Sequence, residues 1–173
     1  MDDTQQATER AIGEWLTWEH PVPEQVWTEW TTHGVALLPL GKRFAAVRMT
    51  MHVVHAAVGS DAPAQVASRL RQLLSGPVVY DRRVAGATYY ALIQWSADLV
   101  WAHDEVAPCL ARGIYMGVPR VDRRKPPGTY WVVAPRYAGN LCTAQAVAAL
   151  VETGRQQLIE SAELSLSEGP ATP

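Results

Sequence analysis

Apolar residues in the first part of the chain recur at helical spacing and then give way to short continuous runs. Residues 4–19 place Ala, Ile, Leu and Trp three or four positions apart, which predicts an amphipathic helix that ends before Pro21. The same spacing predicts a second helix over residues 23–32, and Gly34 is expected to end it. The pattern therefore predicts an N-terminal helical hairpin.

Three pairs of short apolar runs follow, and a polar or basic segment separates the two runs of each pair. The first pair, "VALLPL" and "FAAVRM", flanks Gly41-Lys42-Arg43, and the second, "PVVYD" and "ATYYALIQW", flanks "RRVAG". The third pair, "IYMGVP" and "TYWVVAP", flanks residues 120–128, which we call the basic loop. Apolar runs around turn residues are typical of hairpins, so we predict a largely antiparallel sheet built from hairpins.

Further helices are predicted between these strands and at the C-terminal end. Thr50 is a predicted N-cap for a helix to about Val58, and Asp61 is one for a helix to Leu74. Residues 98–110 also have a helical pattern. Thr143 is the predicted N-cap of a long C-terminal helix.

Composition and length favour one globular domain. The chain has 173 residues, of which 48% are apolar and 18% charged, and it shows no repeat or linker. We expect a single α+β domain over residues 1–166, with helices packed on the sheet, and a disordered tail over residues 167–173. Two isolated cysteines and the absence of a leader or an apolar run of about 20 residues predict a cytoplasmic protein with no membrane partner.

Charge is distributed unevenly, although the formal net charge is only −2. Residues 1–34 hold seven acidic residues and one arginine, whereas residues 35–140 hold thirteen Lys or Arg and six acidic residues. Residues 141–173 are again acidic. Such asymmetry is informative about partners rather than about fold.

The basic middle segment supplies candidate contacts to nucleic acid or nucleotide. Gly41-Lys42-Arg43 is not a P-loop, because that motif needs GxxxxGK[ST] followed by a helix, and here a strand follows. The basic loop is the densest cluster of cations, and the aromatic residues beside it can stack on bases; the alternative is a solvated loop. The predicted nucleic-acid-binding residues are Lys42, Arg43, Arg48, Arg82, Arg83, Arg120, Arg123, Arg124, Lys125, Tyr130 and Arg136.

The order of these motifs resembles a known family. "GVALLPLGKRFAAVRM", "LLSGPVVYD", "YYALIQW" and "GIYMGVPRVDRRKPPGTYWVVAPR" resemble actinobacterial proteins identified as the N-terminal domain of bifunctional DNA primase/polymerases, over residues 8–138. The resemblance implies the fold, and in active members it implies paired metal-binding carboxylates on a strand. Here Ala45 stands where many related proteins place Asp, and neither Asp81 nor Asp122 has an acidic residue two positions away. Polymerase chemistry is therefore not expected, because phosphoryl transfer needs clustered oxygen ligands.

Three histidines are candidates for a metal site or a catalytic base. His52 and His55 lie at i and i+3 of a predicted helix, and His103 lies in "AHDE". Histidines at such spacing are more often packing or surface residues, so no metal and no other cofactor is predicted. A small histidine-dependent enzyme is kept as a third hypothesis.

The preferred hypothesis is a catalytically degenerate, primase/polymerase-like binding or regulatory module that contacts nucleic acid or nucleotide through its basic face. The alternative is a protein-interaction subunit, or a homodimer, that docks through the acidic N-terminal helices or the C-terminal helix. The pairs Trp15/Trp18 and Trp27/Trp30 have helical spacing and are expected to face the core. If they were exposed, they would form a docking patch.

Overall fold

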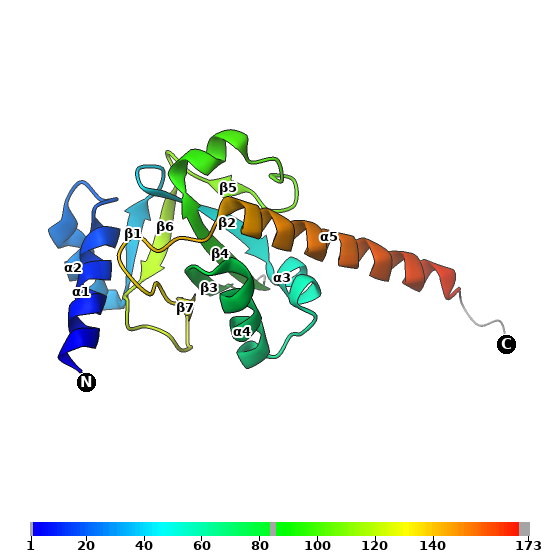
Figure 1. Ribbon diagram of the computed structural model, residues 1–173, viewed down its shortest axis with the longest axis horizontal. Coiled ribbons are helices and arrows are strands. Elements are labelled where there is room, and N and C mark those ends of the chain that lie inside the picture. The colour runs from blue at the N-terminus through cyan, green and yellow to red at the C-terminus, as the bar shows by residue number, and fades with distance from the viewer. Residues whose placement is uncertain (1, 84–85, 170–173) are drawn as a thin grey trace.

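The computed structural model describes residues 2–83 and 86–169 of the chain. It has the predicted fold class, α+β with antiparallel strands, two N-terminal helices and a long C-terminal helix (Figure 1). The helices are α1 (Asp3–Thr17), α2 (Pro23–His33), α3 (Met51–Val58), α4 (Pro63–Leu74), the 3-10 helix η1 (Trp95–Val100) and α5 (Ala144–Ser167). The strands are β1 (Val35–Pro39), β2 (Phe44–Thr50), β3 (Val78–Arg83), β4 (Gly86–Gln94), β5 (Cys109–Leu110), β6 (Tyr115–Pro119) and β7 (Tyr130–Val133).

The strands form two antiparallel sheets, a five-stranded sheet in the order β5-β2-β4-β3-β7 and a two-stranded sheet of β1 and β6. The β3–β4 hairpin is confirmed. The other two predicted hairpins are wrong, because β1 pairs with β6 and β7 pairs with β3. Alternating apolar residues give each strand a buried face but do not select its partner, and here β1 and β6 join across the chain to form a separate layer.

The helix predicted over residues 98–110 is also wrong. The chain forms η1, then a loop in which the Trp101 indole Nε1–H donates to the Ala107 carbonyl (2.8 Å), and then the short strand β5. Ala107 and Trp101 pack against the core, but Leu99 and Val100 are 76% and 81% exposed, so the segment has no continuous buried stripe that would stabilise an amphipathic helix.

Helix caps agree with the sequence in two of three cases. The Thr50 hydroxyl accepts from the Val53 N–H (3.4 Å), and the Thr143 hydroxyl accepts from the Ala146 N–H (3.2 Å), which fixes the starts of α3 and α5. The cap predicted at Asp61 is wrong, since α4 begins after Ala62 with a proline in its first turn.

The five-stranded sheet is buried on both faces. Its residues alternate between them, so that Ala45, Val47 and Met49 face α3, α4 and α5, whereas Phe44 and Ala46 face α1, α2 and the β1–β6 layer. Figure 1 shows α1 and α2 on one side of the sheet and the remaining helices on the other. The four tryptophans of the N-terminal helical hairpin were expected to face the core, and this is confirmed for two of them. Trp15 and Trp30 are buried, but Trp18 and Trp27 are 52% and 37% exposed.

Helix α5 packs on the domain only through its first half. Its buried residues end at Gly154, where a Cβ atom would lie 2.3 Å from the Val53 carbonyl oxygen of α3. The C-terminal half of α5 extends away from the body of the molecule (Figure 1), and Leu158 on it is 39% exposed. Part of the predicted disordered tail, residues 170–173, lies outside the described residues. No helix in the described residues is long and apolar enough to cross a membrane.

Candidate functional site

The Gly41-Lys42-Arg43 turn binds a carboxylate that belongs to the protein itself. Glu19, which is fully buried, follows α1, and its side chain accepts hydrogen bonds from the backbone N–H groups of Lys42 (3.2 Å), Arg43 and Phe44 (3.2 Å). We call residues 41–44 the Glu19-bound turn. Burial raises the pKa of the Glu19 carboxyl, and the three N–H groups partly oppose that shift. The backbone donors that a phosphate would need are therefore already occupied.

The side chains of the Glu19-bound turn lie apart from the basic loop. The Arg43 guanidinium lies over the Trp18 ring, 4.5 Å from its centroid, at the C-terminal end of α1. Arg124 contacts Glu9 in the N-terminal half of α1. The contacts of the two basic segments therefore fall on different parts of one helix.

The three arginines of the basic loop all have partners within the chain. The Arg123 guanidinium donates to two backbone carbonyls, one at the end of α2 and one in the basic loop. Arg120 and Arg124 form ion pairs. The partners are Asp122 for Arg120 (2.6 Å), the carbonyl oxygens of His33 and Pro127 for Arg123 (3.3 and 3.1 Å), and Glu9 for Arg124 (3.4 Å). Lys125 is exposed and has no side-chain partner among the described residues.

Two other predicted contacts lie on different faces of the sheet. Arg48 is opposite Tyr90 in the β2–β4 register, on the face away from Tyr89. Arg82 is opposite Ala87 and shares the face of Tyr89. The side chain of Arg83 lies outside the part of the chain that the structure describes.

A tyrosine pocket of about 320 Å³ lies on the sheet face that α3, α4 and α5 cover, between α3, α4 and the basic loop. Tyr89, Tyr80 and Tyr130 stand side by side on β4, β3 and β7, with ring centroids 5.2 and 5.0 Å apart. The Tyr89 hydroxyl and His55 Nε2 share a hydrogen bond of 3.2 Å, and Asp61 and Arg124 also line the pocket. The tyrosine pocket thus offers aromatic rings together with hydrogen-bonding groups.

Burial favours the uncharged forms of Tyr89, Tyr130 and His55 in this pocket. Burial, with the neighbouring Tyr80 and Tyr130, raises the pKa of the Tyr89 hydroxyl, and burial likewise raises the pKa of Tyr130. Burial lowers the pKa of His55, which Asp61 partly opposes. The aromatic end of the site therefore favours an uncharged group.

An arginine hollow of about 530 Å³ adjoins the tyrosine pocket, and Arg124 lines both. Arg71 from α4 and Arg136 from the segment after β7 complete its cationic wall, while Asp2 and Glu9 of the N-terminal region line it as well. Arg136 is anchored to the Ser75 carbonyl (3.4 Å) at the end of α4, whereas the Arg71 guanidinium has no partner among the described residues.

The two hollows follow the same two structural elements. On α4, Pro63 and Ala67 line the tyrosine pocket, and Arg71, one turn further, lines the arginine hollow. On β7, Tyr130 and Val132 line the first hollow, and Ala134 and Arg136, in the segment after β7, line the second. The β3–β7 register shifts at this point, and Ala134 packs against the core on the α1 side of the sheet, so the two hollows meet around the β7 edge. We refer to the two together as the Tyr–Arg groove. It is aromatic at one end and arginine-rich at the other.

The candidate catalytic and metal-binding residues are not brought together. No group of three or more His, Cys, Asp or Glu side chains in the described residues is placed to hold a metal ion. His52 is exposed on α3, and the His103 ring lies 5.3 Å from that of Trp101, in the loop after η1. Asp81 accepts from the Thr129 hydroxyl, and Asp122 pairs with Arg120, so the two carboxylates serve different contacts.

The two cysteines are free thiols that lie in or near the core. Burial raises the pKa of Cys109 and Cys142 to about 12, so neither is a thiolate at neutral pH.

Three residues of the Tyr–Arg groove were missed by the sequence analysis: Arg71, Tyr80 and Tyr89. Arg71 reads as an ordinary exposed cation of an amphipathic helix, and the tyrosines read as strand residues. Only the alternation of tyrosines on "PVVYD" and "ATYYALIQW" hinted that two could share a face. The packing of α4 near β7 brings Arg71, Tyr80 and Tyr89 close to Arg124 and Arg136. No local sequence pattern predicts that packing.

Comparisons with protein-family models, curated proteins and solved structures found no match. The resemblance to primase/polymerase domains stays a prediction, and the geometry of the site carries the functional argument.

Proposed function

We propose that this chain is a non-catalytic binding module for a nucleotide, which it holds in the Tyr–Arg groove. The observation that carries the proposal is that Arg124 lines both an aromatic pocket and a hollow with two further arginines. A nucleotide has the same division, with an uncharged aromatic base joined to an anionic phosphate group. Of the nucleic-acid-binding residues predicted from sequence, the proposed site keeps Arg124, Tyr130 and Arg136. It also includes Arg71, Tyr80 and His55, which were not among them.

The base would occupy the tyrosine pocket. Tyr80 and Tyr130 are half-buried and present ring surface for stacking, which is worth about 1–3 kcal/mol per base in single-stranded nucleic-acid binding. His55 and Asp61 supply hydrogen-bonding groups for the base edge. Tyr89 is buried beneath them and fixes the orientation of His55 through their shared hydrogen bond.

The phosphates would occupy the arginine hollow. Arg71 is available there, and the Arg124–Glu9 ion pair, at 3.4 Å with the arginine half-exposed, can be exchanged for a phosphate. Guanidinium groups recognise phosphate through paired N–H donors. Glu9 and Asp2 oppose a high charge in the hollow, which favours a compact nucleotide over a long polyanion.

Isothermal titration calorimetry with ATP, adenosine and tripolyphosphate tests this assignment. ATP is expected to bind more tightly than either fragment, because only ATP uses both ends of the groove. Arg71→Ala and Arg124→Ala are each expected to weaken ATP binding about tenfold, the effect of losing one charge-assisted contact.

Lys125→Ala is the matched control, since Lys125 is the sequence neighbour of Arg124 but has no part in the groove. If Lys125→Ala weakened ATP binding as much as Arg124→Ala, the binding would be diffuse electrostatic attraction. If no mononucleotide bound saturably while single-stranded DNA did, with sensitivity to Arg48→Ala, an extended nucleic-acid surface would replace the groove.

A further inference from the structure

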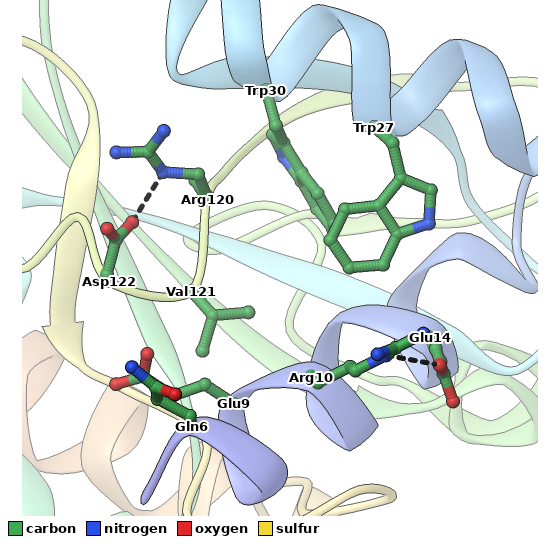
Figure 2. A pocket seen from close by; sticks show the side chains of 9 residues that line it. All are labelled: Gln6, Glu9, Arg10, Glu14, Trp27, Trp30, Arg120, Val121 and Asp122. Atoms are coloured by element: carbon green, nitrogen blue, oxygen red, sulfur yellow. Dashed lines mark hydrogen bonds and ion pairs between the residues drawn. The ribbon is translucent and has the colours of Figure 1, made fainter. Parts of the chain in front are cut away.

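A third hollow lies between α1, α2 and the start of the basic loop, and it shares one lining residue, Glu9, with the arginine hollow. This tryptophan pocket has a volume of about 570 Å³. Figure 2 shows Trp27 and Trp30 extending from α2 toward α1, with Val121 beside them and charged side chains at the edges. It therefore combines an apolar floor with a polar rim, as ligand and partner sites commonly do.

The floor of the tryptophan pocket is held in place by packing. Trp30 is buried, and its indole N–H donates to the Val118 carbonyl (2.9 Å). Trp27 meets Trp30 edge to face at 5.1 Å. On the other side of Trp27, a Cβ at Gly13 of α1 would lie 2.6 Å from the indole ring, so glycine is what lets the helix approach so closely. The exposed part of Trp27 is thus a preorganised apolar surface.

Two ion pairs form separate parts of the rim (Figure 2). Arg10 Nε bonds Glu14 Oε1 (3.2 Å), and Arg120 Nε bonds Asp122 Oδ1 (2.6 Å). Each contact is made through Nε and one carboxylate oxygen. The terminal guanidinium nitrogens and the second carboxylate oxygens of these pairs have no partners among the described residues, so the rim presents both donors and acceptors, which suits a peptide main chain.

We propose that the tryptophan pocket binds a short peptide segment of a partner protein, with one aromatic or large aliphatic side chain flanked by lysine or arginine. The anchor side chain would pack on Trp27 and Val121. The basic flanks follow from charge complementarity with the helical hairpin around the pocket, since residues 1–34 hold seven acidic residues against one arginine. Large apolar side chains in central pockets dominate such interfaces.

The test uses the full chain labelled with ¹⁵N and follows the indole N–H signal of Trp27, assigned with Trp27→Phe. Acetyl-Lys-Phe-Lys-amide is expected to shift this signal saturably at millimolar concentration. Acetyl-Glu-Phe-Glu-amide and acetyl-Lys-Ala-Lys-amide are expected to bind at least about fivefold more weakly, since one reverses the charge and the other removes the anchor.

Glu14→Lys is expected to weaken binding of the basic peptide about fivefold, and Glu24→Lys, an exposed charge reversal on the same helical hairpin, less than about twofold. Equal shifts with all three peptides, or equal effects of the two charge reversals, would overturn the proposal. A Trp27 signal that moves with protein concentration and ignores the peptides would instead identify a second copy of this chain as the occupant, and would also overturn it.

Discussion

The Glu19-bound turn and the basic loop look alike in sequence, since each combines glycine with adjacent cations between two strands, yet their polar groups point in opposite directions. In the turn, the backbone N–H groups face inward and close on Glu19, while Lys42 and Arg43 face outward. In the basic loop, the guanidinium groups of Arg120, Arg123 and Arg124 turn back onto the protein.

The difference separates a structural role from a binding role. The backbone N–H groups of the Glu19-bound turn cannot bind a ligand unless they first give up their hydrogen bonds to the buried Glu19 carboxylate. The turn therefore has a structural role. The Arg124–Glu9 pair is partly exposed and can be exchanged for a ligand at little cost. A cationic cluster is therefore informative about ligand binding only once the partners of its donors are known.

The largest expected effect is from Glu19→Ala. This change leaves the N–H groups of Lys42, Arg43 and Phe44 without their acceptor in a buried site, and should lower the free energy of unfolding by about 3 kcal/mol. Urea unfolding followed by tryptophan fluorescence measures it. Glu24→Ala, in the same helical hairpin, should cause no measurable change. A loss below about 1 kcal/mol for Glu19→Ala would show that water replaces the carboxylate.

Gly41→Ala should lower the free energy of unfolding by about 2 kcal/mol. The residue has φ +99°, and a Cβ there would lie 2.6 Å from the Arg112 backbone nitrogen. Gly113→Ala is the matched control, because Gly113 has φ +89° with open space around it, so that variant should lose only about 1 kcal/mol. Equal losses, measured by urea unfolding, would mean that the close approach to Arg112 adds nothing to the backbone strain.

Arg123→Ala should lower the free energy of unfolding by about 1 kcal/mol. The Arg123 guanidinium donates to two backbone carbonyls, and in the variant only water can hydrogen-bond to them. Lys125→Ala should leave stability unchanged. Thermal melts of the two variants side by side distinguish a structural arginine from a solvated one. The opposite ranking would show that the basic loop does not depend on Arg123.

The smallest effect concerns pH. Since the folded-state pKa of Glu19 is raised above its usual value near 4.5, its contribution to stability is complete below that value and is lost as the pH rises through the folded-state pKa. The stability of the wild type relative to Glu19→Gln, which cannot titrate, should therefore fall as the pH rises above about 4.5. Urea midpoints at several pH values measure this difference. An increase with pH would mean that the three N–H groups outweigh burial.

Local features were predictable from sequence where one element contains all the information. The caps Thr50 and Thr143 act within one helical turn, and the paired strands β3 and β4 are neighbours in the sequence. The pairing of β1 with β6 joins segments far apart in the chain, and alternation alone could not select it.

The candidate site was less predictable than the fold. Arg124, Tyr130 and Arg136 were found because cations and aromatic residues near a loop are visible in sequence, but Arg71 and Tyr80 enter only through the packing of α4 against β7. Likewise, nothing in the sequence distinguishes Glu19 from the other acidic residues of the N-terminal region. Its role depends on a contact with a turn more than twenty residues later.

The close approach of Gly154 to α3 also divides α5 into two thermodynamic parts. Before Gly154, the amide protons are protected by packing, and they exchange with solvent only when the domain opens. After it, the helix has only its own hydrogen bonds, and isolated helices of about 12–15 residues are marginal in water. A hydrogen-exchange profile along α5 should therefore fall from global protection to helix-coil fraying within about one turn of Gly154, in a helix that is continuous in the structure.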